Sequence, residues 1–180
     1  MKNDFERLDA KLIRKTRLFE LKQVTTQRSN GHQFVHDIIF HPGAAVIIPM
    51  LSRDEFVLIK QFRTAAEDIL WEFPAGTLEK GESPLFCAKR EIIEETGFEA
   101  KHWKKLGKFM PAPGISTEMM HLFLAQDLKP KHMDLDHDEF IQRQVVSEKK
   151  LKKMILNGAI IDAKTIVGYF YYLMKQKRQG

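Results

Sequence analysis

The sequence is poor in cysteine and has no long hydrophobic run, and each of these absences excludes a class of protein. Cys87 is the only cysteine among 180 residues, so no disulfide can form within the chain. A chain without disulfides is typical of a reducing compartment. No apolar run approaches the ~20 residues of a membrane span, and the N-terminus lacks a signal-peptide core. We therefore expect a cytoplasmic protein without a membrane partner, in which Cys87 is a packing or helix-surface residue.

The charge balance is basic but mild. The formal net charge is +5, and basic residues are concentrated near both ends of the chain. Such a charge can steer any anionic ligand, from a nucleotide sugar to RNA, towards the protein. It is too small to identify nucleic acid as the partner, and ordinary solvated charge also accounts for it. The length fits one domain with a sizeable core and an N-terminal extension.

A helix with acidic residues on one face is the most informative local feature. Ser83 is a suitable N-cap, Pro84 fits the first helical position and Gly97 fits a left-handed C-terminal end. Glu91 and Glu95, four residues apart, share a face and repel each other unless a cation lies between them. Hard divalent cations prefer carboxylate oxygens, so this face predicts Mg²⁺, with Mn²⁺ as a substitute. A solvated acidic face is the alternative for an isolated cluster. The residues expected in the core are Leu85, Ala88, Ile92 and Ile93.

A longer pattern encloses this helix. It reads Gly, five residues, Glu, seven residues, and then Arg-Glu-apolar-any-Glu-Glu-any-Gly-apolar. Its fixed positions are filled by Gly76, Glu82, Arg90, Glu91, Glu94, Glu95 and Gly97. At average residue usage, seven fixed matches rarely arise by chance. The pattern is the Nudix box, and in it the chain resembles the Nudix hydrolases.

This resemblance implies both a fold and a reaction. The fold would be an α/β/α sandwich with a mixed sheet, and the reaction would be hydrolysis of a diphosphate linkage. Glu91, Glu95 and the backbone carbonyl of Ala75 would bind Mg²⁺, which polarises phosphoryl oxygen and lowers the pKa of bound water. Arg90 would pair with Glu82 or Glu94 and so hold the ligand carboxylates in place. We assign the other charged residues of the box to the catalytic machinery, namely Glu82, Arg90 and Glu94.

The segments around the box narrow the resemblance to ADP-ribose pyrophosphatases and related nucleotide-sugar hydrolases. Residues 61–63 and 70–76 resemble the segment that leads into the box in that group. The resemblance implies that Arg63 contacts the phosphates or ribose of the substrate and that Glu72 contacts its terminal sugar. The alternative for Glu72 is a strand carboxylate paired with a neighbouring arginine.

The loop 111–118 is also similar to that group, which tends to carry a proline about fifteen residues past the box, where this chain has Pro113. We expect Gly114 and Glu118 to contact the substrate, with a generic rigid turn as the alternative. The segment 131–139 is rich in acidic residues, and in the resembled group a glutamate here activates the attacking water or completes the metal shell. Glu139 aligns best.

Asp136 and Asp138 compete with Glu139 for this role, and a merely solvated loop is a third possibility. None of the histidines has the spacing of a zinc site.

The N-terminal part is predicted to form a separate β-lobe over residues 1–41, followed by the hydrolase domain over 42–180. Strands are expected at 19–26 and 33–40, on either side of the Asn30-Gly31 turn signal. Residues 1–15 show no clear period and are expected to form a frayed arm or a short helix.

A similar lobe in the resembled group pairs with the partner subunit. The resemblance therefore implies a homodimer in which Arg28 and Phe34 reach a neighbouring site. An ordinary hairpin charge and an apolar-face aromatic are the alternatives for these two residues.

The remaining pattern predicts alternating strands and helices. Strands are expected at 44–49, 56–61, 106–110, 121–125 and 140–146, and helices at 147–156 and 163–177. The leading function is hydrolysis of a nucleoside diphosphate sugar. Two alternatives stay open: an RNA 5′-end or dinucleoside-polyphosphate hydrolase, and a non-catalytic nucleotide-sensing module.

Overall fold

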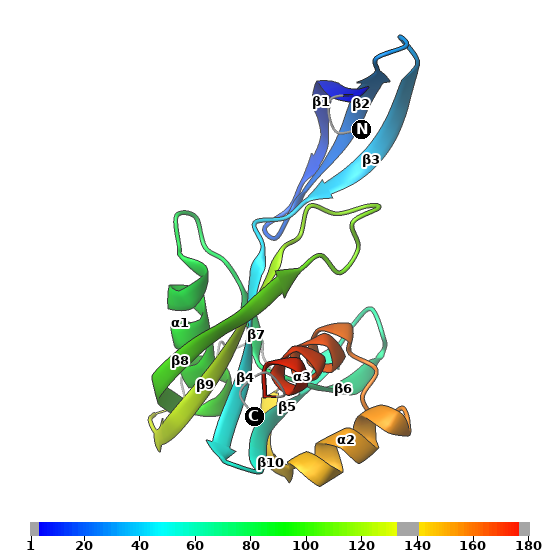
Figure 1. Cartoon of the computed structure of the whole chain (residues 1–180). Coiled ribbons are helices and arrows are strands. Elements are labelled where there is room, and N and C mark those ends of the chain that lie inside the picture. The colour runs from blue at the N-terminus through cyan, green and yellow to red at the C-terminus, as the bar shows by residue number, and fades with distance from the viewer. Residues whose placement is uncertain (1–3, 133–140, 177–180) are drawn as a thin grey trace. The chain divides into compact units, whose positions relative to one another are not determined.

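The chain forms two compact units in a computed structural model that describes residues 4–132 and 141–176. The first unit comprises Met1–Gly43 and Met110–Met119, and the second comprises Ala44–Phe109 and Met120–Gly180. Figure 1 labels their helices and strands. Within the described residues, no helix is long and apolar enough to cross a membrane.

The first unit is built on a three-stranded antiparallel sheet in the order β1-β2-β3. β2 (Glu20–Arg28) and β3 (Gln33–Phe40) form the hairpin that the sequence predicted, with Gly31 at φ 84° in the turn. The segment Met110–Met119 belongs to this unit because its backbone pairs with the end of β3. The amide of Ile39 donates to the carbonyl of Ile115 at 2.8 Å, and the amide of Thr117 donates to the carbonyl of Ile39 at 2.9 Å.

Strand β1 (Phe5–Lys15) corrects the expectation of a frayed arm or a short helix over residues 1–15. It pairs with β2 along its length, but the register shifts between Arg7 and Asp9 and again between Leu12 and Arg14. Each shift inserts a residue and reverses the alternation of side chains between the two faces. The period of two that identifies a strand in a sequence is therefore lost.

The second unit is an α/β/α sandwich, as predicted. Its elements are β4 (Ala44–Ser52), β5 (Glu55–Arg63), β6 (Asp68–Glu72), β7 (Ala75–Thr77), α1 (Pro84–Thr96), β8 (Phe98–Phe109), β9 (Met120–Pro130), β10 (Ile141–Ser147), α2 (Glu148–Leu156) and α3 (Ala163–Gln176). The strand order is β10-β5-β4-β9-β8, with β6 beside β5 and β7 beside β4. The sheet is mixed because β4 and β9 are parallel and the other pairs are antiparallel.

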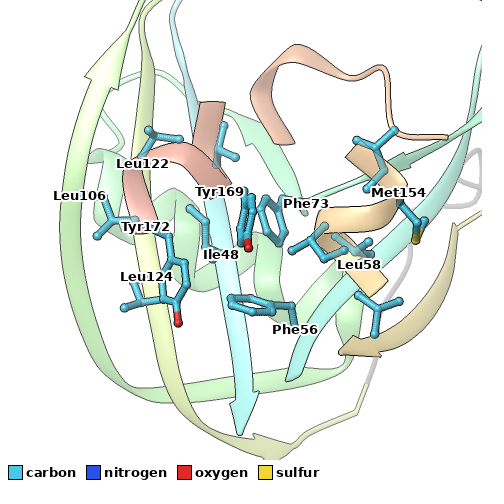
Figure 2. Packing of buried hydrophobic residues seen from close by; sticks show 14 residues of the cluster. Ile48, Phe56, Leu58, Phe73, Leu106, Leu122, Leu124, Met154, Tyr169 and Tyr172 are labelled. Atoms are coloured by element: carbon cyan, nitrogen blue, oxygen red, sulfur yellow. The ribbon is translucent and has the colours of Figure 1, made fainter. Parts of the chain in front are cut away.

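Strand β4 at the centre of this sheet is buried on both faces. Val46 and Ile48 pack into a cluster with residues of α2 and α3, and Figure 2 shows Ile48 beside Phe56, Phe73, Tyr169 and Tyr172. Ala45 and Ile47 face the opposite way, into a smaller cluster with α1. Successive residues of a strand point to opposite faces, so α1 covers one face of the sheet and α2 and α3 cover the other.

Helix α1 begins and ends at the predicted residues. The Ser83 side chain accepts a hydrogen bond from the Phe86 amide, Pro84 is the first residue, and Gly97 lies at φ 63°. Leu85 was expected in the core, but it is 37% exposed and Cys87 is buried instead. The thiol of Cys87 is directed at the carbonyls of Gly76 and Thr77, at 3.4 and 3.7 Å, so the first turn presents its cysteine to β7 rather than its leucine.

Candidate active site

Arg90 gathers three carboxylates of the box around one guanidinium. Its Nη1 donates to Glu91 Oε1 at 2.6 Å and to Glu94 Oε2 at 2.8 Å, and its Nε donates to Glu82 Oε1 at 3.2 Å. Burial alone would lower the pKa of Arg90, but the hydrogen bond to Glu82 and the charges of Glu91 and Glu94 raise it well above the ordinary value. Arg90 therefore stays charged. It fixes the carboxylates that would otherwise repel one another along α1.

Two residues of α1 also reach the turn that begins with β7. Glu95 is 2% exposed, and its Oε2 accepts a hydrogen bond of 2.9 Å from the Ala75 amide. Glu91 lies against the next residue: a Cβ added to Gly76 would stand 1.7 Å from Glu91 Oε1. Only glycine permits this approach. The two carboxylates therefore lie side by side along the backbone of Ala75 and Gly76.

The donor atoms at this turn suit a hard cation. The carboxylates of Glu91 and Glu95 and the carbonyl of Ala75 are all oxygen donors, as Mg²⁺ and Mn²⁺ prefer. Across residues 4–132 and 141–176, no three His, Cys, Asp or Glu side chains are grouped as a metal cluster. Mg²⁺ usually retains several waters and is bound by one or two carboxylates together with substrate phosphates. These residues fit the ion, and their role as its ligands stays a prediction.

Cys87 is not suited to nucleophilic chemistry. Burial and the nearby charge of Glu91 raise the pKa of its thiol to about 12. The thiolate, which is the reactive form, is therefore negligible at neutral pH. Cys87 is buried and packs in the cluster between α1 and the sheet, the first of the two positions expected for it.

Arg63 and Glu72 face each other as an ion pair. Arg63 Nε donates to Glu72 Oε1 at 2.8 Å, and Nη2 donates to Oε2 at 2.6 Å. Glu72 is 1% exposed, and although burial would raise the pKa of its carboxyl, the hydrogen bond from Arg63 and the charge of Lys164 lower it. This geometry is that of the alternative considered for Glu72, a strand carboxylate paired with a nearby arginine. The contacts of Arg63 and Glu72 with a substrate stay predictions.

Sequence reasoning missed Lys164. Its ammonium is buried at the start of α3 and donates to Glu72 Oε2 and, at 3.0 Å, to Asp162 Oδ1. Lysine is rarely buried, so the sequence alone favours an exposed side chain. One signal was available: a cation in the first turn of a helix opposes the helix dipole. A nearby anion offsets that unfavourable interaction.

Four of the residues expected to contact a substrate belong to the first unit. Arg28 lies 3.4 Å from Asp4, and Phe34 packs among the aromatic side chains of its own sheet. Glu118 lies 3.7 Å from the ring nitrogen of His41. Gly114 has no atom within 4 Å of an added Cβ, so packing does not require glycine there. The substrate contacts of these residues stay predictions.

Glu139, expected to activate the attacking water, lies outside the described residues, as do its competitors Asp136 and Asp138.

The chain is similar to characterised proteins over almost its whole length. A family model described as "NUDIX domain" matches residues 40–167. An ADP-ribose pyrophosphatase of Bacillus subtilis (strain 168) is 34% identical over 180 residues, covering 96% of this chain and 97% of the relative. A methanol dehydrogenase activator of Bacillus methanolicus is 33% identical, covering 89% and 88%. A crystal structure of an ADP compounds hydrolase superposes with a TM-score of 0.85 at 26% identity, covering 98% of this chain and 96% of that one.

Proposed function

This chain belongs to the Nudix family as a pyrophosphatase, and we propose that its substrate is a nucleoside diphosphate sugar, with ADP-ribose as the first candidate. The products would be a nucleoside monophosphate and a sugar phosphate. The observation that carries the proposal is the convergence of Glu91 and Glu95 on the turn at Ala75 and Gly76. The choice of ADP-ribose is supported by the name of the Bacillus subtilis relative.

The residues of the box would hold the reaction centre rigid. Mg²⁺ bound at this turn would neutralise charge on the diphosphate and lower the pKa of a bound water. Arg90 restrains Glu91 from one side, and Gly76 leaves room for its carboxylate on the other. Glu95 is fixed by the Ala75 amide. Because these contacts are made by groups of the chain itself, little reorganisation is needed when the diphosphate binds.

Arg63 is suited to binding the diphosphate. A guanidinium has five N–H donors, and two of those of Arg63 are directed at Glu72. The side chain is 39% exposed, so its other donors can reach a ligand. Arginine pairs well with phosphate oxygens because its planar donors match their spacing.

A substrate panel tests this function. ADP-ribose, GDP-mannose, other nucleotide sugars, a dinucleoside polyphosphate and a 5′-triphosphorylated RNA would each be incubated with the protein and Mg²⁺. A phosphatase then releases inorganic phosphate from the monoester products. We expect the fastest release from a nucleotide sugar. Faster turnover of the RNA or of the dinucleoside polyphosphate would overturn the assignment in favour of those substrates.

We also propose that the first unit mediates a homodimer. The large apolar side chains that its sheet exposes include Phe5 and Leu12, which the pairing of β1 with β2 places on one face. Among the described residues of β1, β2 and β3, Val24 alone is buried. A small sheet with so little buried surface is marginal by itself. A second copy would cover it, and Arg28 and Phe34 would then be candidates to reach the partner's site.

A further inference from the structure

A closed ring of hydrogen bonds joins the start of α3 to the strand that leads into the box. Lys164 links Glu72 to Asp162, and Asp162 Oδ2 accepts from the Thr165 amide at 3.0 Å and from its hydroxyl at 2.6 Å. Thr165 Oγ1 in turn accepts from the Phe73 amide at 2.7 Å. Phe73 follows Glu72 in the chain, so the ring closes there. The backbone two residues before Ala75 is thus fixed by α3.

The ring, together with the arginine bound to Glu72, contains more charge than a structural link requires. Lys164 and Arg63 are cations, Glu72 and Asp162 are anions, and the ammonium of Lys164 is buried. Burying a lysine is costly, and an apolar side chain of similar volume often packs as well. The Phe73 amide, which donates to the hydroxyl oxygen of Thr165, already ties α3 to this strand without Lys164. The buried ammonium therefore calls for an explanation beyond the attachment of the helix.

Lys164 and Arg63 bind the same carboxylate. Arg63 occupies both oxygens of Glu72 through its Nε and Nη2 edge, and Lys164 contacts Oε2 as well. With both cations in place, Glu72 cannot rotate away from the arginine without breaking a buried ion pair. The second cation also offsets part of the negative charge of Glu72, which would otherwise reduce the attraction of Arg63 for an anion.

We propose that Lys164 is a positioning residue for the diphosphate: it locks Glu72 against one edge of Arg63, so that the remaining donors of the guanidinium face an anionic ligand. This inference rests on the proposed function, because it assumes that Arg63 binds the substrate phosphates. It extends that function to α3, which lies on the opposite face of the sheet from α1. The ligand concerned is the diphosphate group of the nucleotide sugar.

The first test is the steady-state kinetics of Lys164→Met on ADP-ribose. A phosphate contact made in both the ground state and the transition state affects KM rather than kcat. We expect KM to rise about tenfold or more, the size of one lost charge-assisted hydrogen bond, with kcat nearly unchanged. If Lys164→Met fails to fold, Lys164→Gln keeps a donor for Glu72 without the charge and should show a smaller rise in KM, again with kcat nearly unchanged.

Tyr169→Phe is the matched control. Tyr169 lies on the same helix, is buried, and donates a hydrogen bond of 3.0 Å to Glu148 Oε1. Its loss should lower Tm and leave KM unchanged. If both variants lowered Tm and neither changed KM, Lys164 would be only a structural residue and the inference would be overturned.

The Arg63→Gln background shows whether Lys164 acts through the arginine. We expect Arg63→Gln/Lys164→Met to have about the same KM as Arg63→Gln alone, because effects that pass through one residue do not add. An equal rise in KM in both backgrounds would contradict the inference. If the wild type hydrolysed no nucleotide sugar, the proposed function would fail. Calorimetric titration of wild type and Lys164→Met with ADP-ribose would then decide the inference, which fails if the two bind equally or not at all.

Discussion

Helix α1 pairs its charged side chains with other groups of the chain, whereas the N-terminal sheet leaves large apolar side chains exposed. Along α1, the carboxylates of Glu91 and Glu94 meet Arg90 from the same helix, and Glu95 meets a backbone amide from β7. In the sheet β1-β2-β3, the central strand pairs with both of its neighbours, but Phe5 and Leu12 lie half exposed. The charged region is therefore complete within one chain. We propose that a second copy of the chain covers the apolar region.

This difference indicates where function is sensitive to single substitutions. A network of charges in a buried environment fails when one member is removed, because its partners are left unsatisfied. An exposed apolar surface is tolerant of most changes and responds only to those that alter its association. The box should therefore control catalysis, and the sheet should control assembly.

Glu95→Gln is expected to have the largest effect. Glutamine can still accept the bond from the Ala75 amide but loses the charge that would bind Mg²⁺. The rate on ADP-ribose should fall ~10³-fold or more, because metal-assisted charge stabilisation is worth several kcal/mol. Circular dichroism and Tm should remain close to wild type. Nearly normal turnover, or full activity of the wild type after chelation by EDTA and dialysis, would contradict the metal assignment.

Arg90→Met should have the next largest effect. Without the guanidinium, Glu82, Glu91 and Glu94 lose their common donor. Loss of a residue that orients metal ligands typically weakens metal binding by about 10–100-fold. Titration of the protein with Mn²⁺, followed by electron paramagnetic resonance, measures this directly. Lys89→Met, an exposed neighbour on the same helix, is the control and should bind Mn²⁺ as the wild type does.

Leu12→Asp tests the other side of the comparison. Leu12 is 50% exposed in one chain, and the proposed dimer would cover it. Burial of a leucine is worth about 1.5–3 kcal/mol, so the dimer dissociation constant should rise tenfold or more. Sedimentation velocity at a series of micromolar protein concentrations measures this dissociation constant. Gln23→Asp, on the adjacent strand and the opposite face, should leave the dimer intact. A wild type that sediments as an active monomer would refute the proposal.

The pH dependence of stability should show the smallest effect, since a single carboxyl is involved. The pKa of Glu72 is lowered in the folded state despite its burial. Its stabilising contribution is therefore complete above the ordinary glutamate pKa of about 4.3 and is lost as pH falls through the lowered value. In urea unfolding, Glu72→Gln should lose less stability than the wild type between neutral and acidic pH.

Glu20→Gln is the control from the first unit. The pKa of Glu20 is also lowered, chiefly by its hydrogen bond with Lys22, but the side chain is partly exposed to solvent. Solvent and salt screen such a pair, so Glu20→Gln should follow the wild-type pH profile. A larger change for Glu20→Gln than for Glu72→Gln would reverse the comparison between the two units.

Features with local causes were predictable from the sequence. The bounds of α1 follow from a capping serine, a proline and a glycine within fifteen residues. The pairing of Arg90 with Glu94 follows from helical spacing, and the β2-β3 hairpin follows from its turn residues. By contrast, β1 escaped prediction because its two register shifts reverse the side-chain alternation. Leu85 was misplaced because helical phase alone does not show which side of the first turn meets the sheet.

The sequence by itself determined the family, the acidic face of α1 and the side chains that suit a divalent cation, because each depends on spacing within a short segment. Only the tertiary structure decided what Glu72 contacts. Arg63 lies nine residues away and Lys164 ninety-two residues away. No local period connects residues so far apart. They meet because the sheet and α3 pack around one core, and the buried carboxylate selects its cations only once that core excludes water.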